Sequence, residues 1–370
     1  MRHRRASVIY LKWEKHIVEQ YRPLIGISVG DPAGIGPEIT AKALSLPEIY
    51  EVCKPLAVAE AEMMRDAVAF SGLSLGINAV SSPAAGVYQF GTMDVLDLKN
   101  IDAKSIQHKK VSADCGRASF EYVKKVIELA LDKQIDATVT GPINKEAINK
   151  AGFHYSGHTE IYGDLTKTKD YAMMLTHENF RVIHVSTHVS LKEAINRVKP
   201  ERIYRVIQLA DTTLKQMGIQ EPRIAVCGLN PHCGEGGMFG NEDIEEITPA
   251  IVRAKQDGLC VEGPIPADTV FSKLAGGQYD IVVVMYHDQG HIPTKLKGFV
   301  YDEKTKTWGS ISGLNITVGL PIIRVSVDHG TAFGKAGEGR ANPESMIQAI
   351  KVAATLASTR KQVDECVASL

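Results

Sequence analysis

Short apolar runs alternate with segments of helical spacing along most of the chain. The run LIGISV (24–29) is mostly apolar and is followed by a glycine-rich turn and Pro37, a residue type common in the first turn of helices. In the segment 119–133, apolar residues recur three and four positions apart, which predicts an amphipathic helix. Similar runs begin RVIHVSTH, RIAVCGLNPHC, DIVVVMYHDQG and PIIRVSVDHG. This alternation predicts an α/β fold with a mainly parallel sheet.

The composition of the chain narrows the functional classes to which it could belong. The 370 residues suffice for two lobes, and 44% hydrophobic with 23% charged residues is ordinary for a globular chain. The formal net charge of -1 provides no field that attracts nucleic acid or an anionic membrane. The longest apolar runs, such as 281–285, fall far short of the roughly 20 residues that span a bilayer. We therefore expect neither a nucleic-acid nor a membrane partner.

The ends of the chain and its cysteines indicate a cytoplasmic protein. Residues 1–22 begin with the basic run Arg2–Arg5 and contain no signal-peptide core, so we expect an N-terminal extension without a catalytic role. The six cysteines form no CxxC pair, which favours reduced thiols. A zinc ribbon at Cys227 and Cys233 is not favoured, because Cys227 lies within an apolar run and no second pair exists.

Three histidines follow apolar runs that we expect to be strands. His188 follows VIHVST, His232 follows IAVCGLNP and His287 follows IVVVMY. In α/β sheets the carboxyl ends of strands meet at one edge, where ligands bind. Neutral imidazole is a common ligand of divalent transition metals, and three protein ligands leave room for a substrate. The pattern predicts a metal site, although each histidine alone would more often lie in a hydrogen-bonded loop.

Polar residues near other strand ends suit an anionic substrate. They are His158 and Thr159 in SGHTE, then Lys295, Asn315 and Arg324. Such groups bind phosphate through charge-assisted hydrogen bonds. Two glycine-rich segments, GDPAGIGPE (30–38) and 328–343, join predicted elements, but neither is a GxGxxG nor a Walker A motif. The second segment is equally compatible with a long surface loop.

Eight motifs occur in an order that resembles the 4-hydroxythreonine-4-phosphate dehydrogenase family of vitamin B6 (pyridoxine) biosynthesis. They span residues 23 to about 350 and read GDPAGIGPE, TGPINKEAI, SGHTE, CGLNPHCGEGG, GPIPADTVF, YHDQG, NITVGLPIIR and SVDHGTA. The resemblance implies a two-lobed isocitrate/isopropylmalate dehydrogenase-like fold with mainly parallel sheets and an interlobe cleft. The expected division is an extension (1–22), a first lobe (23–150 plus 329–370) and a second lobe (151–328) with the metal site and dimer contacts.

The same resemblance implies residue roles. Metal ligands fall on His188, His232 and His287, for one divalent ion such as Zn, Mg, Co, Ni or Mn. The family works as a homodimer whose active site lies at the subunit interface and takes one metal histidine from the partner chain. NAD contacts are expected in the segment 329–342. The implied substrate and cofactor residues are His158, Thr159, Lys295, Asn315 and Arg324 for substrate, and His329, Gly330, Thr331 and Asn342 for NAD.

The implied reaction is NAD-dependent oxidation of the 3-hydroxyl of a small 4-phosphorylated C4 hydroxy acid, followed by decarboxylation. Metal coordination would lower the pKa of the reacting hydroxyl. Asp268 and Asp288 are alternative general bases, and either could instead orient a metal-bound histidine. We favour that second role for Asp288, because it adjoins His287. Lys295 is expected to contact phosphate, and it is a candidate proton donor only if burial lowers its pKa.

The sequence departs from the biosynthetic pattern beside its expected substrate residues. An insertion at 301–311, YDEKTKTWGSI, separates Lys295 from Asn315, and His291 is an additional histidine. Both features resemble a branch that acts on 4-phospho-D-threonate or 4-phospho-D-erythronate. The phosphate-type residues disfavour a further branch that oxidises aromatic cis-dihydrodiols. Alternatives from other classes are a metal-dependent phosphohydrolase and a non-catalytic metabolite sensor.

Overall fold

The chain forms two compact units in the computed structural model, which describes residues 21–303, 307–311 and 313–368. The first unit comprises Met1–Thr166 and Pro321–Leu370, and the second comprises Lys167–Leu320. Most of the predicted N-terminal extension lies outside the described residues. Within the described part, no helix is both long and apolar enough to cross a membrane.

The unit boundaries fall at 166 and 320, whereas the sequence predicted 150 and 328. The segment that carries His158 belongs to the first unit because the hydroxyl of Tyr162 donates to Thr138 Oγ1 at 2.9 Å. The strand that begins at Arg324 also belongs there, because it pairs in parallel with the strand that contains Thr138.

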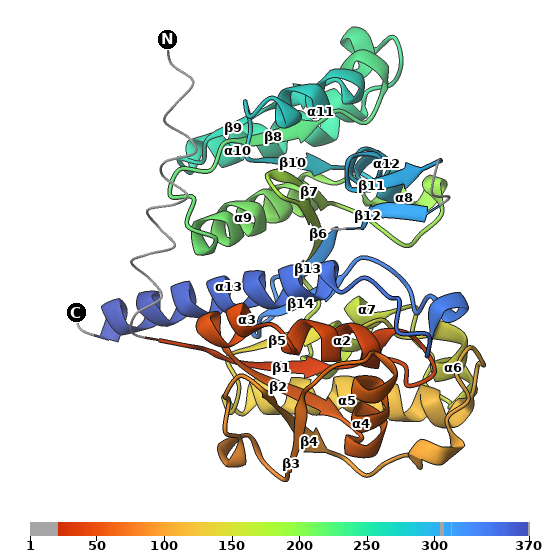
Figure 1. Ribbon diagram of the computed structural model, residues 1–370. Coiled ribbons are helices and arrows are strands. Elements are labelled where there is room, and N and C mark those ends of the chain that lie inside the picture. Colours follow the sequence, from red (N-terminus) through yellow and green to blue (C-terminus); the bar gives the residue numbers. More distant parts are fainter. Residues whose placement is uncertain (1–20, 304–306, 312, 369–370) are drawn as a thin grey trace. The chain divides into compact units, whose positions relative to one another are not determined.

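The first unit is built on parallel strands in the order β3-β4-β2-β1-β5-β14 (Figure 1). Strand β5 is buried along its whole length, as expected of a parallel strand covered on both faces. The strands are β1 (Leu24–Ser28), β2 (Lys54–Ala59), β3 (Gly76–Val80), β4 (Thr92–Asp97), β5 (Ala137–Thr140) and β14 (Arg324–Val327).

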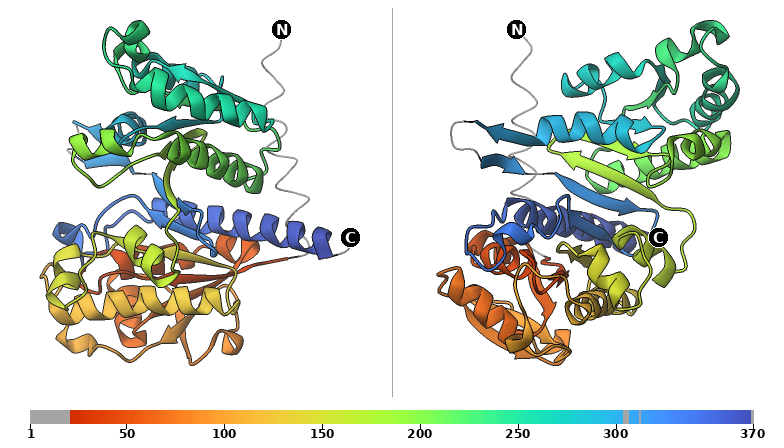
Figure 2. Two further views of the ribbon diagram at one scale, coloured as in Figure 1. Left: turned by 180° about the vertical axis from the view of Figure 1, so that it is seen from behind. Right: turned by 90° about the vertical axis from the view of Figure 1, so that its right-hand side faces the viewer.

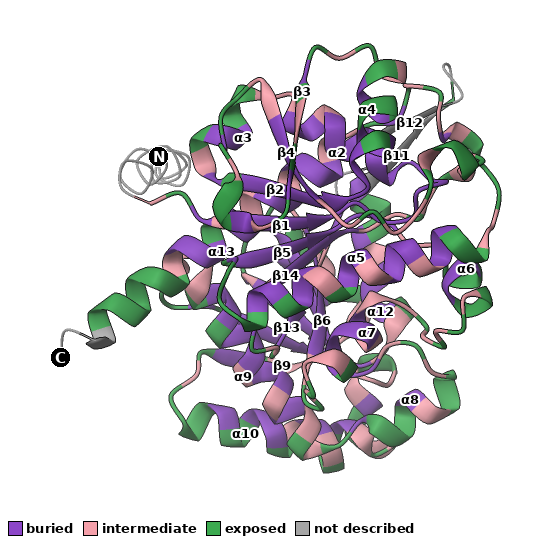
Figure 3. Cartoon of the chain, turned by 90° about the horizontal axis from the view of Figure 1, so that it is seen from below, coloured by how far each residue is buried: buried purple, intermediate pink, exposed green. Residues whose placement is uncertain are grey.

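Two groups of helices pack on these strands. Helix α13 contacts β1, β5 and β14 and lies against α2 and α3, whereas α5 contacts β1, β2 and β5 together with α6 and α7. Figure 3 shows β1, β2 and β5 largely buried and the last turns of α13 exposed. The helices are α2 (Gly36–Leu44), α3 (Pro47–Val52), α4 (Ala61–Phe70), α5 (Ala113–Leu131), α6 (Lys145–Lys150), α7 (His158–Leu165) and α13 (Glu344–Ala368), with short 3-10 turns η1 (Pro83–Ala85), η2 (Ala103–Ser105) and η5 (Phe333–Lys335).

The second unit has strands in the order β13-β6-β7-β10-β8-β9. Strands β7, β10, β8 and β9 pair in parallel, while β13, β6 and β7 pair in antiparallel fashion. The strands are β6 (Ala172–His177), β7 (Phe180–His184), β8 (Ile224–Cys227), β9 (Val261–Ile265), β10 (Ile281–Val284) and β13 (Leu314–Val318). The predicted α/β fold with mainly parallel pairing is confirmed, with these antiparallel strands as an addition.

Alternate residues of the second unit's strands form its core. Val182, Ala225 and Val282 pack with Val270 and Leu274 of α11 on one face. Strands β11 (Phe299–Asp302) and β12 (Thr307–Ile311), from the predicted insertion, form an antiparallel pair that begins at the end of α12 (Figure 2). The remaining elements are α8 (Leu191–Arg197), α9 (Pro200–Gln216), η3 (Pro231–Gly237), η4 (Asp243–Ile247), α10 (Thr248–Gln256), α11 (Ala267–Ala275) and α12 (His287–Gly298).

Gly116 allows α5 to approach α6 closely. A Cβ at Gly116 would lie 2.0 Å from the carbonyl oxygen of Ala147 and 2.7 Å from the nitrogen of Ile148. Both are backbone atoms, which cannot turn aside as a side chain does. The contact therefore holds α6 at the end of the loop that follows β5.

We predict that Gly116→Ala destabilises the first unit by about 1–3 kcal/mol, because added volume in a close-packed contact forces backbone movement. Denaturant unfolding followed by fluorescence measures the shift in midpoint. Gly76→Ala is the matched control, because its Cβ would meet no atom closer than 3.5 Å. Equal midpoints for the two variants would contradict the packing role.

Candidate active site

The first glycine-rich loop lies at the carboxyl ends of β1 and β5, where the chain order of the first unit changes direction. Asp31 donates its backbone N–H to the carbonyl of Pro142 at 2.9 Å. Gly30 has φ +88°, and a Cβ there would lie 2.3 Å from the same carbonyl oxygen. The loops GDPAGIGPE and TGPINKEAI are therefore fixed together.

Asp31 is fully buried at this edge. Its Oδ1 accepts the N–H of Ala33 at 2.8 Å, and its Oδ2 has no hydrogen-bond partner among the described residues. Burial raises the pKa of Asp31 to about 6, although the hydrogen bond from Ala33 acts in the opposite direction. The sequence identified this loop by its glycines, and Asp31 was not among the predicted site residues.

Arg324 forms the centre of a buried polar group in the first unit. Its guanidinium donates to Thr140 Oγ1 at 3.3 Å and lies 5.6 Å from the ring of Tyr162. Only 2% of Arg324 is exposed, and this burial lowers its pKa to about 10. The guanidinium therefore keeps its charge at neutral pH.

His158 begins α7 in the same region. Burial lowers its pKa well below the usual value, and the positive charges of Arg324 and Lys145 lower it further. The neutral ring has a buried Nε2 with no partner within the described chain. Thr159 is buried beside it. Three of the predicted substrate residues thus lie in the first unit, whereas Lys295 and Asn315 belong to the second.

The predicted cofactor residues lie in the loop 329–342 after β14. His329 Nδ1 lies 3.0 Å from the carbonyl of Gly330, and burial lowers its pKa. Thr331 accepts the N–H of Ile35 through its carbonyl at 3.0 Å. Asn342 caps the start of α13 by accepting the N–H of Glu344 at 2.9 Å. These contacts order the loop.

Four imidazoles gather in the second unit. The rings of His287 and His291 stack with centroids 3.6 Å apart, because positions four apart lie on one face of α12. His188 lies 5.6 Å from His287, and His184 at the end of β7 lies 4.9 Å from His291. Of these, His184 was missed in the sequence because it ends an apolar strand and looks like a core residue.

The two inner imidazoles are neutral. Burial lowers the pKa of His184 to about 4 and, with the neighbouring imidazoles, that of His291 to about 3. His184 Nδ1 is 3.1 Å from the carbonyl of Met173, a contact that requires the ring nitrogen to donate. They line one side of His287 without adding positive charge to it.

Asp288 and Gln289 fix the direction of His287. Asp288 Oδ1 lies 2.6 Å from His287 Nδ1, the contact expected of a carboxylate that orients a ligand histidine. Gln289 is buried, accepts the N–H of Met285 at 2.7 Å and donates to the carbonyl of Gly228 at 2.8 Å. It ties the start of α12 to the ends of both β10 and β8.

His232 lies apart, exposed on a loop of left-handed backbone. Consecutive φ values from His232 are 51°, 55°, 81°, 46° and 66°, and three of these residues are not glycine. Each costs roughly 1–2 kcal/mol relative to right-handed backbone, a strain that is characteristic of functional sites. The buried carboxylate of Asp243 stabilises the loop by accepting the N–H groups of Leu229 and Asn230.

The structure thus brings together two of the three predicted metal ligands. His188 and His287 are neighbours, but no group of three His, Cys, Asp or Glu side chains able to hold a metal occurs in the described part of the chain. Asp268 is exposed on the first turn of α11 and acts electrostatically on Cys227 and Cys233. Lys295 is exposed one turn beyond His291, and Asn315 lies partly buried in β13.

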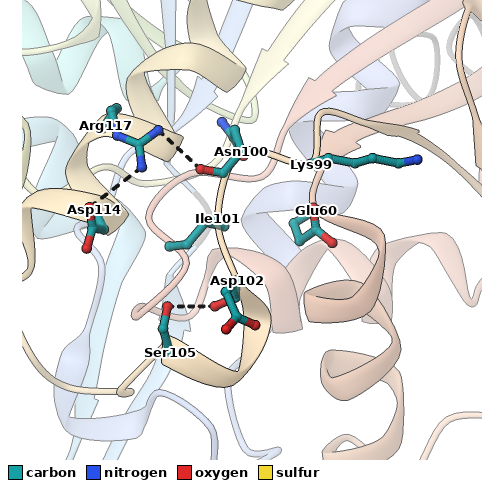
Figure 4. Close-up of a pocket in the computed structure, with 8 residues that line it drawn as sticks. All are labelled: Glu60, Lys99, Asn100, Ile101, Asp102, Ser105, Asp114 and Arg117. Atoms are coloured by element: carbon teal, nitrogen blue, oxygen red, sulfur yellow. Dashed lines mark hydrogen bonds and ion pairs between the residues drawn. The ribbon is translucent and has the colours of Figure 1, made fainter.

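A separate cavity of about 510 Å³ opens at the carboxyl ends of β2 and β4. Figure 4 shows Arg117 directed at the carbonyl of Asn100 and at Asp114, at 3.2 and 3.6 Å. Arg117 and Asp114 thus form an ion pair at this cavity, and no predicted site residue lines it. The lining residues are Glu60, Lys99, Asn100, Ile101, Asp102, Ser105, Asp114 and Arg117.

Known proteins with similar sequences support the family resemblance that the motifs indicate. The family model "Pyridoxal phosphate biosynthetic protein PdxA" matches residues 51–353, most of the chain. The chain belongs to the PdxA family. A "Putative D-threonate 4-phosphate dehydrogenase" of Symbiobacterium thermophilum is 46% identical over 337 residues, which cover 91% of this chain and 97% of that protein.

Solved structures also resemble this one. A 4-hydroxythreonine-4-phosphate dehydrogenase from Klebsiella pneumoniae is 41% identical, with a TM-score of 0.80 over 91% of this chain and 98% of that one. A terephthalate 1,2-cis-dihydrodioldehydrogenase from Burkholderia xenovorans LB400 is 28% identical, with a TM-score of 0.64 over 90% and 98%. The predicted family resemblance is confirmed.

Asp31 generates a testable pH dependence. Because burial raises its pKa from 3.8 to about 6, the folded chain keeps a proton that the unfolded chain has lost between these pH values. Stability then falls as pH rises through this window, by up to about 3 kcal/mol. Asp31→Asn cannot ionise, so its stability relative to wild type should increase from pH 4 to pH 7.

Denaturant midpoints at a series of pH values measure this difference. Asp114→Asn, whose side chain is 73% exposed, controls for the loss of one carboxylate in the same unit. Parallel profiles for Asp31→Asn and wild type would show that the Asp31 carboxyl is not held protonated by burial.

Proposed function

We propose that this chain is an NAD-dependent, divalent-metal-dependent dehydrogenase of a 4-phosphorylated C4 hydroxy acid. Oxidation of the 3-hydroxyl yields a 3-oxo acid, a hydride equivalent on NAD and a proton. Loss of carbon dioxide then leaves a phosphorylated ketone. The observation that carries the proposal is the His188–His287 pair in a member of a family whose relatives are named as dehydrogenases of 4-phosphorylated acids.

His188 and His287 fit a metal-binding role, and we propose His232 of a second chain as the third ligand. Asp288 orients His287 through Nδ1, so the lone pair of Nε2 is available for coordination. A bound divalent cation supplies Lewis acidity to the reacting hydroxyl. The neutral rings of His184 and His291 exclude water from behind the pair without repelling a cation.

Exposed apolar side chains of the second unit support a homodimer. Met238 and Phe239 follow His232 on its loop, and Ile292 and Leu296 project from the helix of His287. Met238 is 73% and Leu296 81% exposed, unusual values for large apolar residues, which often mark association surfaces. A dimer through these surfaces is the proposed means by which His232 serves another chain.

We assign the phosphate of the substrate to Arg324, supported by Thr159, Lys295 and Asn315. The Arg324 guanidinium stays charged at neutral pH although it is buried, so attraction to an anion is strong in its low-dielectric surroundings. His158 is neutral there and offers Nε2 as a hydrogen-bonding atom.

The general base is proposed to be Asp268 and the orienting carboxylate Asp288. Asp288 is already engaged with His287 at 2.6 Å, which leaves Asp268 as the candidate for the base. Lys295, exposed on α12, is proposed as a phosphate contact. We propose that His329, Gly330, Thr331 and Asn342 would hold NAD, which would supply the hydride acceptor.

Among 4-phosphorylated acids, we propose D-threonate 4-phosphate as the substrate. Relatives with this name at 46% identity span 91% and 92% of this chain, and the insertion at 301–311 lies beside Asn315 in the sequence. This substrate carries a hydroxyl at C2 rather than the amine of 4-hydroxythreonine phosphate.

A spectrophotometric screen tests the function. We predict NADH formation, read at 340 nm, with D-threonate 4-phosphate and a divalent metal, and loss of most turnover after chelation. D-erythronate 4-phosphate, 4-hydroxy-L-threonine 4-phosphate and NADP are the comparison reactants.

The outcomes separate the alternatives. Release of inorganic phosphate without reduced cofactor would indicate a phosphohydrolase. Binding of the acids without turnover under any condition would indicate a metabolite sensor. Undiminished turnover in a metal-free protein would reject the metal-dependent mechanism.

A further inference from the structure

Helix α2 carries an ion pair, Glu38 and Lys42, whose contacts reach the distant loop 329–342. Glu38 is fully buried, and its Oε1 accepts Lys42 Nζ at 2.8 Å and the backbone N–H of Ala341 at 2.6 Å. Lys42 Nζ also donates to the carbonyls of Gly339 at 2.9 Å and Ala341 at 2.8 Å. All three ammonium hydrogens are thus used, two of them on one short backbone segment.

The backbone held by this pair has little room to move. Gly339 has φ +68°, and a Cβ there would lie 2.5 Å from the carbonyl oxygen of Phe70. Gly337 has φ +75°, and a Cβ there would lie 2.7 Å from the ring of His108. Because both positions are glycine, the backbone of the loop packs directly against these neighbours. The Glu38–Lys42 pair holds the loop in this closely packed conformation.

The other end of the loop is tied to the residue that precedes α2. Ile35 donates its N–H to the carbonyl of Thr331 at 3.0 Å, and a Cβ on Gly34 would lie 2.9 Å from Thr331 Cβ. The segment 34–42 therefore holds the loop at residue 331 and again at 339–341. The two glycine-rich segments of the sequence form one structural element.

Exposed ion pairs contribute less than the Glu38–Lys42 pair to the conformation of the loop 329–342. Glu338 pairs with Lys109 and with Arg340, whose side chains are 45% and 57% exposed. Exposed pairs of this kind contribute little to stability, because solvent screens them. Removing one partner of a buried pair is far more disruptive, because the remaining charge is left uncompensated. The Glu38–Lys42 pair therefore governs the conformation of residues 339–341.

We propose that Glu38 and Lys42 are positioning residues that hold the loop 329–342 in its dinucleotide-binding conformation before NAD binds. This inference rests on the proposed cofactor role of that loop. A loop ordered in advance pays no ordering cost on binding, so the pair strengthens cofactor affinity without contacting the cofactor.

Steady-state kinetics of Lys42→Met test the inference. The methionine keeps much of the apolar stem and removes the three hydrogen bonds. We expect the KM for NAD to rise about tenfold or more, with kcat at saturating NAD and the KM for the phosphorylated acid within about threefold of wild type. Lys351→Met is the matched control, because it removes an exposed pair with Glu48 in the same unit and should change none of these constants.

Limited trypsin digestion provides a readout that does not depend on turnover. Lys335 and Arg340 are cleavage sites within the loop, and cleavage there follows the frequency of local opening. Lys42→Met should be cleaved faster at both sites than wild type, and NAD should slow cleavage. If the single variant folds poorly, the double variant Lys42→Met with Glu38→Gln replaces it in both measurements, because the double variant leaves no uncompensated charge.

The outcomes distinguish this inference from the proposed function. Wild-type turnover with NAD and an unchanged KM for NAD in a folded Lys42 variant would overturn the positioning role alone. A wild-type chain that neither turns over nor is protected by NAD would reject the cofactor role of the loop, and the inference with it.

Discussion

The position of His287 depends on one buried carboxamide. Gln289 accepts from the end of β10 and donates to the backbone after β8, so both its polar groups are satisfied inside the second unit. This fixes the first turn of α12, where His287 lies beside His188 and stacks on His291. A buried amide with unpaired groups would cost several kcal/mol, which makes this geometry strongly preferred. The proposed metal site is built on that constraint.

The two units contribute different chemistry. The second provides neutral, closely packed imidazoles and one exposed histidine on a strained left-handed loop. The first provides a buried, charged Arg324 and two glycine-rich segments joined by Glu38 and Lys42. In both, burial selects the charge state: it keeps His184 and His291 neutral, whereas the pKa of Arg324 starts so high that the guanidinium remains charged.

Periodicity was enough to predict β1, β7, β8, β10, β14 and the α/β class, because buried parallel strands read as short apolar runs. It placed His188 and His287 at strand ends, where the structure has them within one cluster. It did not predict His184, since an imidazole that ends a core strand has no distinguishing pattern. Nor did it predict the Glu38–Lys42 contacts, which join residues about three hundred positions apart. The predicted division at residue 328 differs from the one at 320, because motif spacing does not reveal that β14 pairs with β5.

The proposed metal site requires His232 of one chain to complete the pair that His188 and His287 form in another. Two differently tagged chains, one His232→Ala and the other His188→Ala with His287→Ala, can be co-expressed and the mixed dimers isolated through both tags. Metal analysis should find each homodimer depleted and the mixed dimer with about half the wild-type content, because one of its two sites is intact. A mixed dimer as empty as its parents, beside a metal-loaded wild type, would contradict the shared site.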